Sequence, residues 1–327
     1  MDTKDRILVG VSGSPGSRAA VRYASHEAAR TSAALRIVHV APSYRPLISL
    51  YPTAASVTPA EVEAVGHAIL VQASYEAQWY LDESDVERLL LTGERGRGLI
   101  AASRDVRMIV LGRTRGDTVR RIATGRLVAS VAQHAAVPIV LVPETWVPSQ
   151  PRGRLLVGLK RLDAIPVALV RAALQLADQR NAALQLVHVA TATPDDNGAG
   201  AVAHRTAGEA AAHEVRRRLE DLFGEFPAVP VTVEVPSGDP ATYLVARSAS
   251  EDALVISRGV RHPSGGHDAN VGSAVLRSSQ CPVVVVPVAD EPMPTDLGDI
   301  GAEVVSAPGA RLGARRGERE EKRDEFA

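Results

Sequence analysis

The chain repeats its own pattern at an interval that matches the length of a domain. Three apolar segments of the first half return in the second half in the same order, after 148, 149 and 144 residues. These pairs of segments are 7–11 and 155–159, 35–41 and 184–190, and 137–143 and 281–287. A repeat of this length is a domain rather than the short unit of a solenoid. The sequence therefore predicts two related domains, and differences between them become evidence about function.

Each copy alternates short apolar strands with helices. The predicted strands are 7–11, 35–40, 86–91, 106–111 and 137–142 in the first copy, and 154–159, 184–189, 229–235, 252–256 and 282–286 in the second. The predicted helices of the first copy are 18–33, 60–83, 96–104 and 125–135. Strands that alternate with helices pair in parallel through right-handed crossovers. The sequence thus predicts an α/β fold in which each domain is a five-stranded parallel sheet flanked by helices.

Composition shifts divide the chain into four parts. We expect a first domain over 1–144, a linker over 145–153, a second domain over 154–289 and a tail over 290–327. The linker holds two prolines and a glycine. The tail ends in a mixed-charge segment with few apolar residues, which predicts disorder. Proline-rich 42–59, glycine-containing 112–124 and polar 191–207 are predicted loops.

The last strand of each copy predicts how the two domains meet. Segments 137–142 and 282–286 are apolar on both faces and stand last in their domains, where a sheet edge is expected. An exposed apolar edge promotes aggregation and has to be covered. We therefore expect the two edges to pair within one chain, and a homo-oligomer stays open as a further assembly.

Charge and hydropathy limit the partners. The net charge is −1, so the chain as a whole has no field that favours nucleic acid or an anionic membrane. No apolar run approaches the ~20 residues that span a bilayer, and charged residues 1–6 lead directly into a strand rather than a signal peptide. We expect a cytoplasmic protein. The one cysteine, Cys281, stands in an apolar strand and is expected to be a buried, unreactive thiol.

The loop after the fourth strand is the first candidate site. Open parallel sheets bind ligands beyond the carboxyl ends of their strands. Segment 112–126 lies at such an end and contains glycines, which free backbone N–H groups, and five arginines. The helix that starts near Gly125 adds a favourable dipole for an anion. The pattern is compatible with a phosphate site and equally with a solvated basic loop.

The paired units resemble a tandem universal stress protein. The resemblance rests on ILVGVSGSPGSRAAVRYASHEA, on LRIVHVAP and on the run from MIVLGRTRG to VPIVLVP, and it covers about 5–143 and 152–288. It implies a Rossmann-like (adenine nucleotide alpha hydrolase-like) fold that forms dimers. In many members of this family, ATP binds through Gly-x2-Gly-x9-Gly followed by Ser or Thr, together with an Asp after the first strand.

The first copy matches this motif in part. Gly112 matches the first glycine, the second falls on Arg115 with Gly116 one place late, and Gly125 matches the third. Arg126 replaces the hydroxyl residue, and its guanidinium suits a phosphate but could also fill the pocket. Ser12 replaces the aspartate. The residues that the resemblance implies for ATP or a related adenine nucleotide are Gly10, Val11, Ser12, Val40, Leu111, Gly112, Arg115, Gly116, Gly125, Arg126 and Leu127.

The second copy departs further from the motif. An ungapped alignment from Pro282 places Ile256 at the first glycine, whereas a gapped one recruits Gly272 and Ser273. We favour the ungapped alignment. In the turn after the first strand of this copy, Leu162 removes a polar partner. We expect the second copy to bind nucleotide poorly or not at all.

Histidines end the second strand of both copies. His39 and His188 invite a metal or catalytic interpretation, but neither has a second ligand at a useful spacing. We expect structural histidines that cap backbone groups, and no metal. His262 and His267 flank two glycines without carboxylates or cysteines, which is a weak metal pattern. No nucleophile elbow and no acid–base pair is found, so no catalytic residue is assigned.

Three function classes remain open at this point. The first is a stress regulator whose first copy binds ATP or a related nucleotide. The second is a stress protein with a degenerate cleft that acts through contacts with an unidentified protein. The third is an enzyme of the wider nucleotide-hydrolase group, and although we expect no enzyme, a weak ATPase activity stays open. Gly112 and Gly125 favour the first class, whereas Ser12, Arg115 and Arg126 favour the second.

Overall fold

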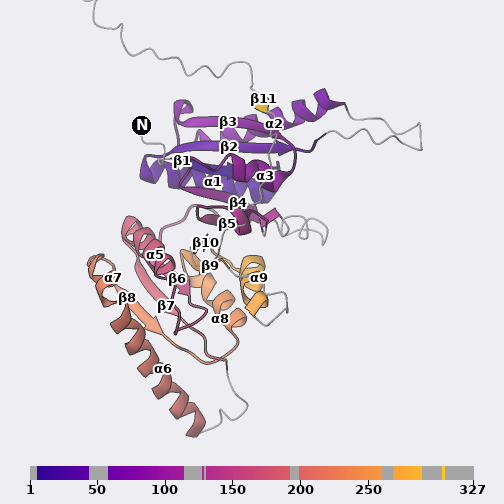
Figure 1. Cartoon of the computed structure of the whole chain (residues 1–327). Helices are drawn as coiled ribbons and strands as arrows, with labels where there is room; N and C mark the ends of the chain where they lie inside the picture. The colour runs from indigo at the N-terminus through magenta and orange to yellow at the C-terminus, as the bar shows by residue number, and fades with distance from the viewer. Residues whose placement is uncertain are drawn as a thin grey trace, which may run out of the picture.

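The two halves of the chain share one continuous sheet (Figure 1). The computed structural model describes residues 6–43, 58–113, 127–128, 130–191, 199–258, 268–288 and 304–305. The sheet has eleven strands in the order β11-β3-β2-β1-β4-β5-β10-β9-β6-β7-β8. The strands are β1 Arg6–Gly10, β2 Ala34–Ala41, β3 Val86–Thr92, β4 Met108–Arg113, β5 Ile139–Pro143, β6 Arg154–Gly158, β7 Ala183–Val187, β8 Val231–Glu234, β9 Ala253–Ser257, β10 Val283–Val286 and β11 Val304–Val305.

Each half has the same strand order. The first half runs β3-β2-β1-β4-β5 and the second runs β8-β7-β6-β9-β10, and all pairs within a half are parallel. The strand order therefore reverses beside β1 and β6, because β2 and β7 lie on one side and β4 and β9 on the other. This arrangement confirms the predicted α/β fold with two five-stranded parallel units. The domain boundaries stay predictions.

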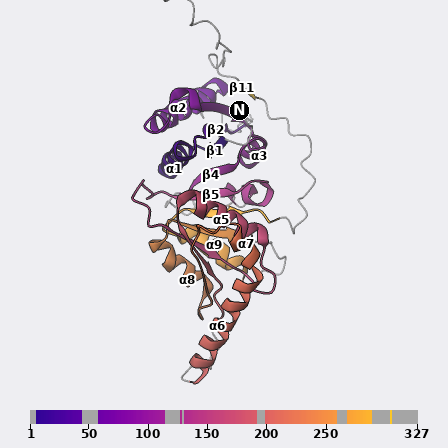
Figure 2. The same cartoon turned by 90° about the vertical axis from the view of Figure 1, so that its left-hand side faces the viewer.

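Helices cover both faces of the sheet. In the first half, Figure 2 shows α1 and α2 on one side of the strands and α3 on the other. The described helices are α1 Pro15–Thr31, α2 Pro59–Ala77, α3 Arg95–Ala101, α5 Val167–Arg180, α6 Ala199–Arg218, α7 Glu220–Gly224, α8 Pro240–Arg247 and α9 Asp268–Ser278, together with helical residues 127–128 and 130–134. Side chains of successive strand residues alternate between two buried clusters. One cluster packs under α1, α2, α5 and α6, and the other under α3, α8 and α9.

Local sequence explains where α1 begins and ends. Ser14 accepts a hydrogen bond from the Ser17 amide, and Pro15 stands at the first helical position. The helix stops at Ser32, which adopts the left-handed conformation with φ of 51°. The helix thus begins three residues before the predicted start at 18, because residues 15–17, predicted as part of the turn, form its first turn.

The predicted meeting of the two apolar edges is confirmed. Strands β5 and β10 pair antiparallel and join the halves into one sheet. Val140 and Val284 lie directly opposite each other and are 1% and 7% exposed. Both side chains belong to the cluster under α1 and α5, so the joint is a continuation of the core rather than a surface contact.

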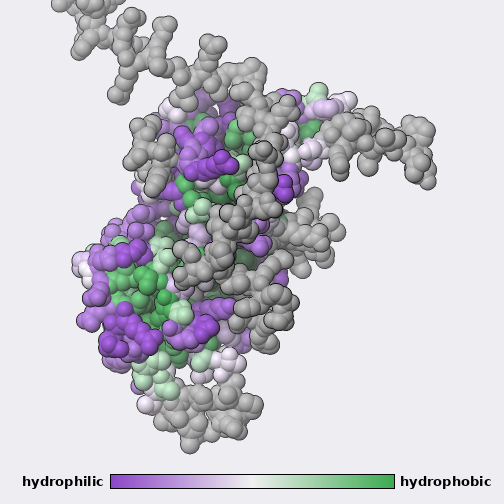
Figure 3. Space-filling model, viewed as in Figure 1, coloured by the Kyte–Doolittle hydropathy of each residue, from purple (hydrophilic) through white to green (hydrophobic). Residues whose placement is uncertain are grey.

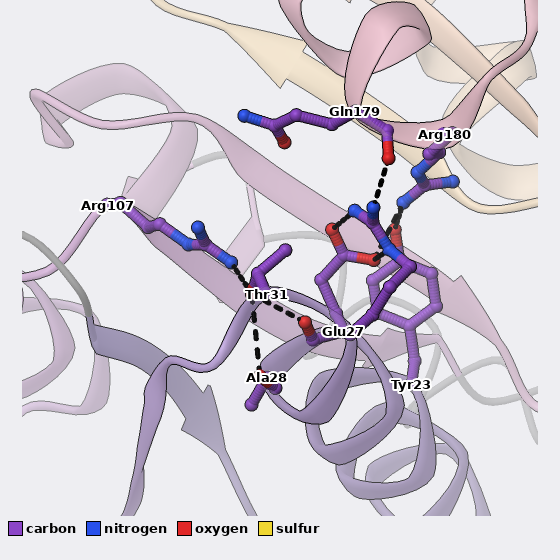
Figure 4. A network of polar contacts seen from close by, with 8 residues as sticks. Tyr23, Glu27, Ala28, Thr31, Arg107, Gln179 and Arg180 are labelled. Carbon is purple, nitrogen blue, oxygen red and sulfur yellow. Dashed lines mark hydrogen bonds and ion pairs between the residues drawn. The ribbon is translucent and has the colours of Figure 1, made fainter.

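A buried ion pair joins α1 to α5 across the same joint (Figure 4). The Glu27 carboxylate, 4% exposed, lies 3.2 Å from Nη2 of Arg180 and 2.6 Å from Nη2 of Arg30. Arg180 also donates to the Tyr23 hydroxyl at 2.7 Å, and Arg30 donates to the Gln179 carbonyl at 2.5 Å. Burial alone would raise the pKa of Glu27, but attraction to Arg180 and the hydrogen bond from Arg30 outweigh it and lower this pKa.

Removing the charge of Glu27 should destabilise the joint. The change Glu27→Gln leaves Arg180 buried without its counter-ion, and we expect a loss of about 3 kcal/mol in the free energy of unfolding. Because the pKa of Glu27 is lower in the folded chain, its contribution is complete above the unfolded value and is lost as pH falls through the folded value. Denaturant unfolding from pH 7 to pH 3 measures both effects. Glu225→Gln, which breaks a half-exposed pair with Arg171, is the matched control and should change stability little.

Two arginines make reciprocal contacts between the halves. Arg113, at the end of β4, donates to the carbonyl of Leu276 at 3.0 Å and also to the carbonyl of Ser279. Arg258, just after β9, donates to the carbonyl of Gln133 at 3.0 Å. Arg113 of the first half thus contacts α9, the last helix of the second half. Arg258 of the second half contacts helical residues 130–134, the last helix of the first half. Arg113, predicted as one of the five arginines of the anion loop, makes a structural contact between the halves instead.

Several sequence predictions need correction. The predicted loop 191–207 is wrong from 199 onward, because α6 begins at Ala199, where an alanine-rich run favours helix. In the predicted disordered tail, Val304–Val305 form β11 and pair antiparallel with β3. The rest of 290–327, most of the predicted loop 42–59 and almost all of 112–124 lie outside the described residues. Other strand ends shift by one or two residues.

Figure 3 shows an apolar area on the second half, over α5 and the adjoining strands, framed by hydrophilic residues. Helix α6 packs against β8, where Arg216 donates a hydrogen bond to the Val231 carbonyl. At the end of α6, Arg218 donates a hydrogen bond to the carbonyl of Leu162, in the turn after β6. The partly buried Ile165 and Val233 pack against the core in this part of the second half. The two halves therefore share strand order but differ in how their second helix is placed.

Candidate functional site

The candidate site starts where β4 meets the first turn of α1. In the sheet, Gly10 pairs with Leu111, so the carboxyl ends of β1 and β4 lie side by side. A Cβ atom placed on Gly112 would lie 2.0 Å from the Gly16 carbonyl oxygen and 2.7 Å from the Ser17 amide nitrogen. No side chain fits there. Gly112 is therefore required for the contact between β4 and the N-terminus of α1, which carries the positive end of the helix dipole.

The apolar candidates lie on two different faces of the sheet. Leu111 and Val40 belong to the cluster under α3, and Val40 packs against Gly98 of that helix. A Cβ on Gly10 would meet the Leu111 side chain at 2.8 Å, so this leucine already fills the space beside Gly10. Val11 belongs instead to the cluster under α1. The structure thus brings Gly10 and Leu111 together, and separates Val11 from them by the sheet.

Ser12 is exposed and already has a polar partner. Its Oγ donates to Oγ of Ser14 at 3.0 Å, and Ser14 in turn caps α1. The hydroxyl therefore supports the helix cap and does not reproduce the carboxylate that the family motif has at this place. Gly13 adopts φ of 73° and forms the turn between the two serines.

The rest of the predicted motif lies mostly outside the described residues. This applies to Arg115, Gly116, Gly125 and Arg126, whose roles stay predictions. Leu127 is described, and it packs partly buried against the cluster under α3. His262 and His267 of the second half also lie outside the described residues.

Strand register corrects the alignment of the second half. Leu111 pairs with Gly10 and with Leu141, and Ile256 pairs with the equivalent residues Gly158 and Val285. Ile256 is therefore the counterpart of Leu111. The prediction that Ile256 stands at the first glycine is wrong by one residue, because the connection from β9 to β10 is one residue shorter than that from β4 to β5.

The corrected register places Ser257 where the first half has Gly112. The facing helix differs as well. Leu162, the counterpart of Ser14, cannot cap a helix, and α5 begins only at Val167 with no side-chain cap. The first helical turn that meets Gly112 thus has no equivalent, so that a serine fits at 257.

His39 and His188 hold the ends of β1 and β6, as expected for structural histidines. His39 Nδ1 lies 2.8 Å from the Val11 carbonyl oxygen, and His188 Nδ1 lies 3.0 Å from the Leu159 carbonyl oxygen. A carbonyl can only accept, so each Nδ1 carries the proton. Burial lowers the pKa of His39, Arg95 lowers it further, and the hydrogen bond to Val11 opposes both.

The lowered pKa of His39 predicts an acid-sensitive fold. The folded chain keeps His39 neutral, whereas in the unfolded chain it takes up a proton near pH 6.5. Unfolding therefore binds protons, and the free energy of unfolding should fall as pH drops below about 6.5. Chemical denaturation from pH 7.5 to pH 5 of the wild type and of His39→Asn measures this contribution. An identical slope in both proteins over that range would contradict it.

Among the described residues, the other titratable groups offer no alternative centre. Cys281 is buried, and burial raises the pKa of its thiol to about 12, which confirms the expected unreactive cysteine. Within the described ranges, no three His, Cys, Asp or Glu side chains gather into a group that could hold a metal ion. None of the described helices has the length and hydropathy needed to cross a membrane.

A small hollow lies between α1 and α2 beside the turn after β1. Its lining includes Val11, Gly13, Ser17, Ile69 and Glu76, and its volume is about 10 Å³. That is room for about one water molecule, so the hollow does not hold a nucleotide.

Comparison with known proteins agrees with this architecture. The Universal stress protein family matches residues 4–143 and again residues 151–287. A universal stress protein of Mycobacterium tuberculosis is 28% identical over 311 residues, which cover 88% of this chain and 96% of the relative. A relative from Mycolicibacterium smegmatis is 28% identical over 295 residues, covering 87% and 97%.

A solved structure shares the fold over nearly the same length. The universal stress protein of Archaeoglobus fulgidus superposes with a TM-score of 0.61 at 15% identity, over 88% of this chain and 98% of that one. The similarity therefore extends across both halves and not only across one domain. With two family matches that together span most of its length, the chain belongs to the universal stress protein family, in a tandem form.

Proposed function

We propose that this stress protein binds an adenine nucleotide in its first half and none in its second. The observation that carries the proposal is the contact between Gly112 and the first turn of α1. The contact puts the positive end of a 17-residue helix beside the end of β4, the strand that precedes Arg115, Gly116, Gly125 and Arg126 in the sequence. Backbone amides and guanidinium groups of that loop would bind the phosphates.

The difference between the halves supports a single nucleotide site. The second half has Ser257 in place of Gly112, and its helix α5 starts a turn later. It therefore lacks the helix terminus that the first half places at the corresponding strand end. An anion at the end of β9 would therefore find neither the positive end of a helix dipole nor the free amides of a first helical turn.

Calorimetry with ATP, ADP and AMP on the intact chain tests the proposal. We expect heat of binding to the wild type, and the double variant Arg115→Ala/Arg126→Ala should weaken the affinity by about tenfold or more, since each charged hydrogen bond contributes roughly 1.5–3 kcal/mol. Arg161→Ala, in the turn after β6 of the second half, is the control that removes an arginine outside the proposed site, and it should bind like the wild type. Absence of both heat and thermal stabilisation at millimolar ATP would eliminate nucleotide binding.

The second candidate is a stress protein whose cleft binds no nucleotide and which acts through contacts with another protein. Two observations favour it: Ser12 is already bonded to Ser14, and Leu111 fills the space beside Gly10. This candidate predicts no nucleotide response in calorimetry. Neither candidate assigns a catalytic residue, and steady ATP turnover that is lost on changing one side chain would favour an enzyme instead.

A further inference from the structure

Exposed large hydrophobic side chains are concentrated on one helix. In the part of the chain that the structure describes, six such side chains are exposed, and four of them lie on α2 or in the turn after it. These four are Val65 at 60%, Val71 at 41%, Tyr75 at 66% and Trp79 at 85% exposure. Figure 2 shows α2 on the outside of the first half, away from the joint with the second half.

Three of these four residues, Val71, Tyr75 and Trp79, lie in one line along α2 and the turn after it. Ala64, Ala68, Val71 and Tyr75 follow one another at spacings of four, three and four, which is the spacing of a helix seam, and Trp79 stands four residues further. We call these five residues the outer stripe. The opposite side of the helix already fills the core with Gly66, Leu70, Ala73 and Ala77. Helix α2 is therefore apolar on two opposite sides, and the fold uses only one of them.

The second half provides an internal comparison. Helix α6 is the counterpart of α2 in chain order, although it is placed differently, and over 205–218 its exposed side chains are small or polar, including Arg205, Glu209, His213 and Arg217. No large hydrophobic residue of that stretch is exposed. The same architecture is thus stable without an outer stripe. The stripe is not required by the fold, and an exposed apolar patch with polar edges is typical of a docking surface.

Charge around the stripe limits what can dock there. From Thr58 to Glu87 the sequence has no lysine or arginine. Glu61 and Glu63 stand at the start of the helix, and Asp82 and Glu83 follow its end. A second copy placed on the stripe in either direction would bring acidic ends together, which disfavours self-association. An anionic membrane is disfavoured for the same reason.

We propose that the outer stripe of α2 docks a basic amphipathic helix of another protein. The apolar seam of that helix would pack between Val71, Tyr75 and Trp79, and its lysines or arginines would face the acidic ends of the stripe. Tyrosine and tryptophan are the side chains that most often anchor such contacts. The inference does not depend on nucleotide binding, since none of the residues proposed to bind the phosphates belongs to α2.

The probe is a synthetic peptide of about three heptads with leucine at the seam and lysine elsewhere. A second peptide of the same length carries glutamate in place of lysine. Anisotropy of a fluorescent label on the peptide reports binding to the full-length chain. We expect the lysine peptide to bind about tenfold more tightly than the glutamate peptide or better, and the difference to shrink at high salt.

Two double variants separate the stripe from unspecific charge attraction. Tyr75→Ser/Trp79→Ser should weaken the lysine peptide by about tenfold or more. Val147→Ser/Val167→Ser removes two exposed hydrophobic side chains elsewhere and should bind like the wild type. Both variants keep every charge of the chain. Equal binding by the wild type and the stripe variant would overturn the proposal, as would equal binding of both peptides.

Sedimentation of the free protein tests whether a second copy of this chain, rather than another protein, occupies the stripe. We expect the same mass for the wild type and for Tyr75→Ser/Trp79→Ser. A wild-type dimer that this variant converts to a monomer would assign the stripe to a second copy and overturn the proposal. In a Trp146→Phe background, the emission of Trp79 should shift to the blue when the lysine peptide binds, because an 85% exposed indole becomes buried.

Discussion

The double variant Val140→Asp/Val284→Asp should open the joint between the two halves. The two side chains lie opposite each other in the β5–β10 pair and are almost fully buried. Two carboxylates placed there would be desolvated and would repel each other, at a cost that we expect to exceed about 4 kcal/mol. We expect an extended particle in small-angle scattering, and rapid proteolysis between the halves.

The outcome can be separated from general unfolding. Val167→Asp places the same charge on a side chain that is 52% exposed, and it should leave particle size and protease resistance unchanged. Circular dichroism shows whether the halves of the double variant keep their secondary structure. An unchanged radius of gyration in a folded double variant would mean that the β5–β10 pair does not hold the halves together.

Replacing Gly112 by valine should destabilise the first half and abolish nucleotide binding. Its Cβ would overlap the Gly16 carbonyl, which belongs to the backbone and cannot rotate away, so α1 and β4 would have to separate. We expect a loss of about 3 kcal/mol in the free energy of unfolding. Thermal denaturation and calorimetry with ATP measure the two effects.

Matched substitutions test whether the effect belongs to this contact. Gly224→Ala, at the end of α7, adds a methyl group where no atom lies within 4 Å, and it should change stability by less than about 0.5 kcal/mol. Ser257→Val makes the corresponding change in the second half, where the first turn of the facing helix is absent. A loss in Ser257→Val as large as in Gly112→Val would show that the two strand ends are packed alike.

The sequence predicted part of the candidate site. Gly112, Ser12 and Val40 could be placed near the ends of their strands because each follows or ends a clearly apolar run, and their roles in binding stay predictions. The partners of these residues could not be assigned. That Gly112 lies against Gly16, that Leu111 fills the space beside Gly10, and that Ser12 bonds to Ser14 depend on strand order and on where α1 begins. The one-residue error at Ile256 arose because connection lengths differ between copies, and only strand register shows that.

The sequence by itself determined the duplication, the alternation of strands and helices, and the apolar last strands that had to be covered. These features follow from local periodicity and from burial, which each segment carries in its own residues. The tertiary structure alone decided the strand order, the pairing of Glu27 with Arg180 over 153 positions, and the outer side of α2 that remains apolar. Those outcomes join residues far apart in the chain, and the free energy that selects them arises only when the elements pack together.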